Sequence, residues 1–408
     1  MTDTATHPDS QASGASAPPG TDAHWALLPT GFHDGLPPLA EHEAKVVDGL
    51  MACIASHGYD RVKPPLCEFE TSLLAGAGQA LASETFRLMD PASQRMMGLR
   101  ADMTTQIARL AASRLSSAPR PLRLGYAGQV LRVTGGQIRP ERQIAQVGAE
   151  LIGATGPAAD AEVAALALKA LEKVGVTGLS LDLTVPTLVG KILDAHAHAD
   201  REGDGDGDRD RIMAALDRKD AADVRALGTP VAKLLHALLR AEGAAEKALD
   251  AARKLALPDS VAADLDELAD IVARLRVLAP GTTLTIDFVE HRGFRYHTGV
   301  TFSLFARRGR GELGRGGRYI TASPAGRAGE PATGVTLYLD SILHTIPAAT
   351  PMRRIYAPYG ADAAAVAALR DSGRIVISGL SADAGPRDEA RRLGCADILV
   401  DGAVHPVD

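Results

Sequence analysis

Alternating apolar side chains in neighbouring segments most strongly restrict what this chain can fold into. A period of two residues, or a short apolar run bounded by turn residues, is typical of β-strands. Segments with such patterns are TFRLM (85–89), RLGYAGQVLRV (123–133), RQIAQVGAELIG (142–153), LSLDLTV (179–185), LTIDFVE (284–290), TGVTFSLFA (298–306) and TGVTLYLD (333–340). Several follow one another without a helical pattern between them, which favours antiparallel pairing over repeated strand–helix–strand units. We therefore predict an α+β fold built on an antiparallel sheet.

Helices are expected to flank this sheet. Apolar residues recur at helical spacing in 40–57, 104–115 and 160–174. A further strand is expected through RVKPPLCEFE (61–70). The hydrophobic content of 46% is enough to build a sizeable core between helices and sheet.

Composition changes along the chain predict its domains. Residues 1–26 are polar and rich in Ala, Ser, Pro and Gly, which predicts a disordered tail. Residues 190–278 are rich in Ala, Leu, Lys and Asp with helical periodicity, which predicts a helical insertion between two parts of one core, 27–189 and 279–346. After a Pro-containing linker, residues 353–408 alternate short β-type runs with helical patterns and are expected to form a small α/β domain.

The distribution of charge and apolar residues excludes several classes of protein. The net charge is −6 with both signs spread along the sequence, so no overall basic field indicates a nucleic-acid binder. The first residues lack the apolar block of a signal peptide, and no run approaches the ~18 apolar residues needed to span a bilayer. We expect a cytoplasmic protein without membrane contact.

No segment has the spacing of a metal site. Cys53, Cys67 and Cys395 show neither CxxC spacing nor flanking His ligands. The acidic segment GDGDGDRD (203–210) resembles a calcium loop, but Arg209 and Ala215 stand where an EF-hand needs Gly and Glu. We interpret it as a flexible acidic turn and predict no metal.

Two clusters of polar residues lie next to predicted strands and helices. In LRADMTTQIARLAA, Asp102 and Thr104 precede a helical run, where they would cap exposed amides or face a ligand. In RQIAQVGAELIG, Gln146 and Glu150 lie on one face of a strand and flank Gly148, which is expected to leave open space between them. The alternatives for this second cluster are a pocket floor and a solvated sheet face.

Two further clusters follow the helical insertion. HRGFRYHTGVTF (291–302) offers a cation, a phenol and an imidazole at Arg292, Tyr296 and His297, and a polar ligand is one way to pair these groups. GELGRGGRYI (311–320) has arginine–glycine content that could suggest RNA contact, but its glycines favour a mobile loop leading to a strand.

Taken in order, these motifs resemble the catalytic core of class II aminoacyl-tRNA synthetases, and specifically histidyl-tRNA synthetase, from about Leu28 to Ile346. YDRVKPPLCEFE resembles the first class II motif, VLRVT followed by RQIAQVGAE the second, and GRGGRY with ATGVTLYLDSI the third. RGFRYHTG resembles the histidine-recognition signature RGLDYYTG. The resemblance implies a class II antiparallel sheet core with flanking helices.

The resemblance also implies a pocket for histidine. Asp102 and Thr104 would hold the α-amino group, and Arg132 would face the carboxylate. Gln146 would help to position the ligand and Glu150 would face its imidazole. Arg292 and Tyr296 would close the pocket. The last residue of the implied pocket is His297, which stands where the signature has a second tyrosine.

The nucleotide side of the pattern differs from the synthetase motifs. Thr134 replaces a glutamate of the second motif, Ile144 replaces the aromatic residue on which adenine stacks, and Ser341 replaces the arginine that holds the γ-phosphate. Loss of one charge-assisted hydrogen bond, about 1.5 to 3 kcal/mol, weakens binding roughly tenfold to a hundredfold. We therefore expect no adenylation, no catalytic residues and no cofactor.

A synthetase fold with an amino-acid pocket but no nucleotide pocket resembles the regulatory subunits of ATP phosphoribosyltransferase. That resemblance implies a non-catalytic protein that assembles with the short-form catalytic subunit, as a homodimer within a hetero-octamer, and does not bind tRNA. The complex is required for the first step of histidine biosynthesis, and the subunit conveys feedback by histidine. The alternatives are a histidine-tRNA ligase, and a stand-alone histidine sensor or RNA-binding remnant.

Overall fold

The computed structural model describes residues 26–136, 140–197, 205–290, 296–309, 311–322, 328–348, 352–382 and 385–407. The predicted tail at 1–26 therefore lies, except for its last residue, outside the described residues. The chain forms two compact units. One contains Lys45–Ile346 with the residues up to Gly35, and the other contains Pro347–Asp408 with Leu36–Ala44.

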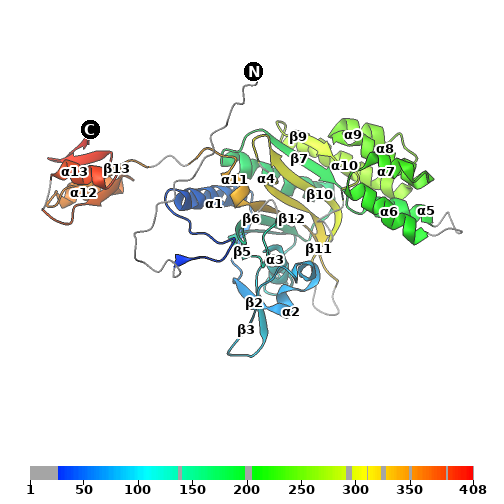
Figure 1. The fold of residues 1–408 in the computed structure, drawn as a ribbon, viewed down its shortest axis with the longest axis horizontal. Helices are drawn as coiled ribbons and strands as arrows, with labels where there is room; N and C mark the ends of the chain where they lie inside the picture. Colours follow the sequence, from blue (N-terminus) through cyan, green and yellow to red (C-terminus); the bar gives the residue numbers. More distant parts are fainter. Residues whose placement is uncertain are drawn as a thin grey trace, which may run out of the picture. The chain divides into compact units, whose positions relative to one another are not determined.

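The larger unit is built around a mixed sheet (Figure 1). Among the described residues this sheet has nine strands, in the order β1-β5-β6-β12-β11-β10-β7-β9-β8. Their bounds, in this order, are Asp60–Arg61, Leu122–Leu131, Gln143–Ile152, Pro331–Tyr338, Gly314–Ile320, His297–Ala306, Leu179–Thr184, Thr283–Ile286 and Gly243–Ala244. All pairs from β5 to β7 are antiparallel, whereas β1 with β5 and β7 with β9 are parallel. The predicted α+β class with an antiparallel core is confirmed.

Helices cover both faces of this sheet. The cluster that contains Val147, Ala149 and Leu151 of β6 packs with α1 (Leu39–Ser56), α4 (Pro157–Lys173) and α10 (Asp259–Leu278). Ile144 and Ile152 of the same strand belong to a second cluster, with α3 (Thr104–Ala112). Alternation along β6 therefore directs Gln146 and Glu150 to the face that α3 covers, as period two requires.

A run of helices connects β7 to β9. They are α5 (Leu188–Ala197), α6 (Gly205–Asp217), α7 (Ala221–Ala226), α8 (Pro230–Ala241), α9 (Ala245–Ala252) and α10. Asp220 and Thr229 accept hydrogen bonds from the first amides of α7 and α8, which fixes the starts of these helices. The acidic turn predicted in this region is wrong from Gly205 onward, because α6 begins there. Ile212 and the other apolar side chains of α6 pack into the main core. The free energy gained by this burial outweighs the low helix propensity of the glycines in α6.

Two further predictions of local structure are wrong. RVKPPLCEFE is not one strand, because the prolines at 64 and 65 lack N–H donors. Its ends instead form β1 and β2 (Cys67–Phe69), and β2 belongs to a separate sheet of order β2-β4-β3, with β4 at Met96–Leu99 and β3 at Arg87–Met89. Short helical segments follow at Glu70–Leu73 (α2) and Gly76–Leu81 (a 3-10 helix), and α11 spans Leu339–Leu343.

GELGRGGRYI is also not a loop, because Gly314–Ile320 is β11, in the centre of the main sheet. Its glycines are required by close packing. A Cβ atom at Gly316 would lie 2.3 Å from the carbonyl oxygen of Gly334 and 2.5 Å from the ring of Phe302. Glycine here marks a close approach of neighbouring strands and not a flexible connection.

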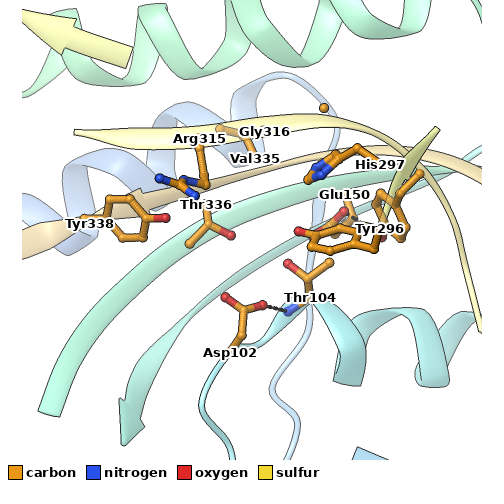
Figure 2. Close-up of a pocket in the computed structure, with 13 residues that line it drawn as sticks. Asp102, Thr104, Glu150, Tyr296, His297, Arg315, Gly316, Val335, Thr336 and Tyr338 are labelled. Atoms are coloured by element: carbon orange, nitrogen blue, oxygen red, sulfur yellow. Dashed lines mark hydrogen bonds between the residues drawn. The ribbon is translucent and has the colours of Figure 1, made fainter. Parts of the chain in front are cut away.

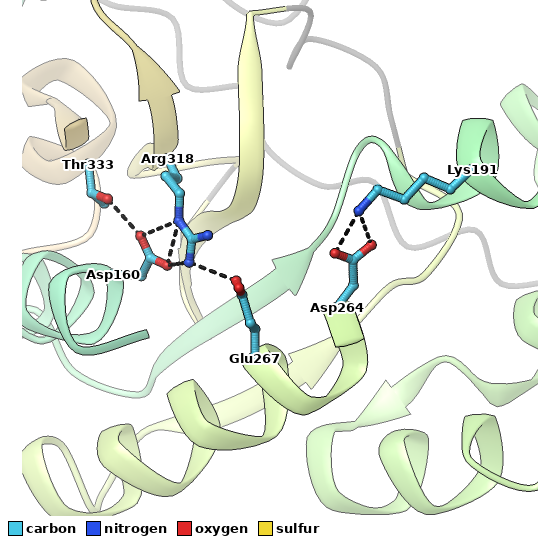
Figure 3. A network of polar contacts seen from close by, with 6 residues as sticks. All are labelled: Asp160, Lys191, Asp264, Glu267, Arg318 and Thr333. Atoms are coloured by element: carbon cyan, nitrogen blue, oxygen red, sulfur yellow. Dashed lines mark hydrogen bonds and ion pairs between the residues drawn. The ribbon is translucent and has the colours of Figure 1, made fainter. Parts of the chain in front are cut away.

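A buried polar network joins β11 to the helices behind the sheet (Figure 3). Arg318 of β11 forms ion pairs with Asp160 of α4 and, across 2.9 Å, with Glu267 of α10. Thr333 of β12 donates to Asp160 at 2.6 Å. Nearby, Lys191 of α5 forms an ion pair with Asp264 of α10. Arg318 thus connects the central sheet to two helices.

The smaller unit contains a four-stranded sheet of order β14-β13-β15-β16. Its strands are Ile375–Ser378, Arg354–Ala357, Asp397–Val400 and Ala403–Pro406, and its helices are α12 (Ala363–Asp371) and α13 (Pro386–Arg392). The first three strands are parallel and β16 is antiparallel to β15. The predicted small α/β domain is confirmed, with β16 as an additional strand. Across the described residues of both units, none of the helices combines the length and apolar character that crossing a membrane requires.

Candidate functional site

Two adjoining cavities lie against the face of the main sheet that α3 covers, and Figure 2 shows the lining of the smaller one. The inner cavity, about 40 Å³, extends to Glu150, His297 and Tyr319. The outer cavity, about 330 Å³, includes Glu84 and Arg132. The side chains that line both are Asp102, Thr104, Tyr296, Arg315 and Tyr338. The combined space is of a size that suits a small polar molecule.

Asp102 is held in a fixed orientation at the start of α3. One of its carboxylate oxygens accepts a hydrogen bond from the backbone N–H of Thr104 at 2.8 Å. The other accepts from the amide Nε2 of Gln146 at 3.0 Å, and the Oε1 of Gln146 accepts from the N–H of Met103 at 3.3 Å. Gln146 thus supports Asp102 from behind and is not among the lining residues of either cavity. Asp102 combines the two alternatives weighed from sequence, since it binds a helix amide and faces the cavity.

Glu150 is the buried acid of the site. The Tyr319 hydroxyl donates to its Oε2 at 2.9 Å, and the Tyr126 hydroxyl donates to its Oε1 at 3.4 Å. Burial raises its pKa to about 8, against the opposing effect of the Tyr319 and Thr104 hydrogen bonds. Near neutral pH this carboxyl group therefore accepts or releases a proton readily.

Tyr126 of β5 organises the polar floor of the pocket. Its hydroxyl lies 2.9 Å from the Oγ1 of Thr336 and 3.3 Å from the Oγ1 of Thr104, in addition to the contact with Glu150. Tyr126 pairs with Gly148 across β5 and β6. The prediction of open space at Gly148 is therefore wrong, because a Cβ atom there would lie 2.3 Å from the Tyr126 hydroxyl.

Tyr296 and His297 form the wall at the start of β10. Their rings stack with centroids 4.1 Å apart, and Tyr296 meets Tyr319 edge to face at 5.9 Å. Desolvation and the nearby carboxylates of Asp102 and Glu150 raise the pKa of Tyr296, so the phenol stays protonated. This wall combines apolar ring faces with hydroxyl and imidazole groups.

The predicted site residues are distributed unequally around the cavities. Asp102, Thr104, Glu150, Tyr296 and His297 line the inner cavity together. Arg132 lines the outer cavity, where its guanidinium pairs with Glu84 across 3.5 Å. The predicted residue Arg292 lies outside the described residues. Within the described chain, no group of three His, Cys, Asp or Glu side chains could hold a metal ion.

Comparisons with known proteins identify the family of the chain. A family model described as histidyl-tRNA synthetase matches residues 31–342, and one described as ATP phosphoribosyltransferase subunit HisZ C-terminal domain matches residues 352–403. The ATP phosphoribosyltransferase regulatory subunit of Paramagnetospirillum magneticum is 53% identical over 384 residues, covering 94% of this chain and 98% of that protein. The chain belongs to the ATP phosphoribosyltransferase regulatory subunit family.

Other members and solved structures extend the comparison. The family member from Rhodospirillum centenum is 51% identical, over 94% of this chain and 96% of its own length. A crystal structure of an ATP phosphoribosyltransferase regulatory subunit/histidyl-tRNA synthetase from Bacillus halodurans has a TM-score of 0.75 at 25% identity, covering 90% of this chain and 96% of that one. Histidyl-tRNA synthetase from Nostoc, at 19% identity and a TM-score of 0.73 over 92% of this chain and 91% of its own, shares the fold.

Sequence reasoning missed part of the pocket wall in this family member. The missed residues are Tyr126, Arg315, Tyr319, Thr336 and Tyr338. Had GRGGRYI been predicted as a strand, period two would have placed Arg315 and Tyr319 on one face. Pairing of a tyrosine with Gly148 depends on the register between β5 and β6, for which the sequence gives no local signal.

Proposed function

We propose that the chain is the non-catalytic regulatory subunit of an ATP phosphoribosyltransferase and binds free histidine as its effector across the two adjoining cavities, with the ring toward the inner one. The observation that carries the proposal is that Asp102 and the buried Glu150 line the same pocket in a family member. Asp102 would receive the α-amino group and Glu150 the imidazole. Because Gln146 and the amide of Thr104 already fix Asp102, little ordering of this carboxylate would be needed on binding.

The partner in this proposal is a short-form catalytic subunit of ATP phosphoribosyltransferase, with the chain as a homodimer inside a hetero-octamer. Histidine can shift the complex toward a less active state only if it binds that state more tightly. A coupling free energy of about 1 to 3 kcal/mol between an effector site and a second site is ordinary. Copurification with the catalytic subunit, followed by calorimetry with histidine, tests both parts. Absence of histidine binding with and without the catalytic subunit would contradict the effector role.

The residues at the nucleotide positions support a non-catalytic role. Ile144, which stands where the synthetases have an aromatic residue, is buried in a core cluster with Met103 and Ile107 of the α3 side. Ser341 lies in the short helix α11, and Thr134 follows β5. We predict that the protein shows no histidine-dependent exchange of pyrophosphate into ATP, at a protein concentration where a histidyl-tRNA synthetase control is active. Exchange above background would favour the ligase.

Histidine affinity is expected to peak between about pH 6.5 and 8. Burial raises the pKa of Glu150 to about 8, and free imidazole of histidine has a pKa of about 6.5. Between these values the carboxyl group and the imidazole share one proton and carry no net charge. Above pH 8 an uncompensated carboxylate remains, and below pH 6.5 a second proton leaves an uncompensated imidazolium. Both are costly in a buried site, so affinity should fall on either side, by up to about tenfold per pH unit.

Calorimetry between pH 5.5 and 8.5 measures this profile. The phenols that face Glu150 do not titrate in this range, because burial raises the pKa values of Tyr126 and Tyr319 further above their ordinary value. The control variant is Glu150→Gln, which keeps the shape but cannot titrate, so its weaker binding should not decline from pH 7.5 to 8.5. A wild-type affinity that is constant over the whole range would argue against contact between Glu150 and the imidazole.

A further inference from the structure

Arg315 places a cation in the wall of both cavities, at a position to which sequence reasoning assigned no role. It lies on β11, with its Cα opposite Thr336 on one neighbouring strand and Ser303 on the other. Its side chain is 38% exposed. A cation that lines both cavities together with Asp102 and Tyr338 influences any charged ligand bound there.

The guanidinium of Arg315 is oriented by an acidic partner. Glu312 accepts hydrogen bonds from its Nε at 3.1 Å and its Nη2 at 2.6 Å. Ser303 donates to the other oxygen of Glu312 at 2.6 Å, which fixes that carboxylate in turn. A guanidinium has five N–H groups, more than one carboxylate can occupy. Glu312 therefore pre-positions the guanidinium of Arg315, a group that can bind more than one anion.

The cavity is electrically asymmetric. Figure 2 shows Arg315 beside Tyr338 and Thr336, across the cavity from Glu150 and Tyr296, with Asp102 on the side of α3. A zwitterionic amino acid with a basic ring carries three groups that match this arrangement. Its ring would face Glu150, its ammonium Asp102, and its carboxylate the cation on β11.

Arg132 fits the carboxylate less well. Like Arg315, it lines the outer cavity together with Asp102 and pairs with one carboxylate, but it is absent from the inner lining, where Glu150 lies. Arg315 lines both cavities together with Asp102. The carboxylate of a histidine whose ring faces Glu150 is only a few bonds from that ring, so its partner should border the inner cavity, which favours Arg315.

We propose that Arg315, and not Arg132, binds the α-carboxylate of the effector and makes the pocket select amino acids over amines. The inference rests on the proposed effector site and names the group that sets its specificity. The matching ligand pair is histidine and histamine, which differ by the carboxylate. One charge-assisted hydrogen-bonded pair corresponds to roughly tenfold to a hundredfold in affinity, and we expect the wild-type chain to prefer histidine by that factor.

The test is calorimetry of the full-length chain with histidine and with histamine, for the wild type, Arg315→Gln and Arg132→Gln. The preference for histidine should fall to near one in Arg315→Gln and persist in Arg132→Gln. The ratio of two ligands within one variant is insensitive to a general loss of stability, because both need the same folded pocket. Arg315→Lys, which keeps the charge but not the planar fork, should retain part of the preference.

The outcomes separate this inference from the proposed function. If the wild type binds histidine and Arg315→Gln retains the full preference, the assignment to Arg315 is overturned while the effector site stands. If the preference disappears in Arg132→Gln instead, the carboxylate belongs to Arg132. If the wild type binds neither ligand, alone or with the catalytic subunit, the effector site itself fails.

Discussion

Replacing Gly334 with alanine is expected to weaken histidine binding by at least about a hundredfold. Gly334 of β12 lies opposite Glu150 of β6, and a Cβ atom there would lie 1.8 Å from the Oε2 of Glu150 and 2.4 Å from its Cδ. The carboxyl group would have to leave its position between the Tyr126 and Tyr319 hydroxyls. Because Glu150 is fully buried, it cannot move into solvent, and the imidazole would lose its partner.

Gly190→Ala is the matched control, because a Cβ atom at Gly190 of α5 meets nothing within 4 Å. In that helix alanine should leave binding unchanged and stabilise the fold by up to about 1 kcal/mol. Glu150→Gln, which adds no volume, tests the same contact should Gly334→Ala fold poorly. Calorimetry measures binding and circular dichroism checks the fold. A folded Gly334→Ala protein with histidine affinity within threefold of the wild type would refute the role of Glu150.

The faces of the sheet could be predicted from the sequence, whereas the contents of the pocket could not. Alternation in RQIAQVGAELIG correctly directed Gln146 and Glu150 to one face. It could not show that Tyr126 fills the space over Gly148, because that depends on which residue of β5 pairs with it. Register between strands is a property of the whole sheet and is set by packing on both of its faces.

The misinterpretation of GELGRGGRYI had the largest consequence for the site. Glycine weakens strand propensity, so the sequence of this segment predicts a loop. In the folded protein neighbouring backbone and the Phe302 ring occupy the space that larger side chains would need. With β11 unrecognised, Arg315 and Tyr319 received no place in the pocket, although period two would have given them one. Tyr296 and His297, by contrast, were found because their polarity conflicted with an ordinary strand.

Replacing Arg318 with methionine is expected to lower the free energy of unfolding by about 3 kcal/mol, within the usual range for a broken buried ion pair. The side chains of Arg318 and Asp160 are 13% and 1% exposed. In the variant, Asp160 would therefore be a buried carboxylate without its arginine, still accepting the hydrogen bond from Thr333. Desolvation already raises the pKa of Asp160 despite Arg318, and loss of the guanidinium would raise it further. At low pH this carboxyl group is protonated in the variant and in the wild type. Because both folded-state pKa values lie above the ordinary value near 4, the stability difference between variant and wild type should shrink as the pH falls from 7 toward 4.

The double variant Asp160→Asn with Arg318→Met should recover part of the loss, because the neutral amide removes the unpaired charge. Arg274→Met is the matched control: Arg274 pairs with Asp270 on the exposed side of α10, both about 45% exposed, and its loss should cost under about 1 kcal/mol. Urea unfolding at pH 7 and pH 4 gives these free energies.

A cost for Arg318→Met no larger than that of Arg274→Met would mean that the network between the sheet, α4 and α10 contributes no more than a surface ion pair. A larger loss of unfolding free energy that disappears at low pH would assign the destabilisation to the buried Asp160. Glu267 is 42% exposed, so removal of Arg318 leaves its carboxylate solvated and changes its free energy little.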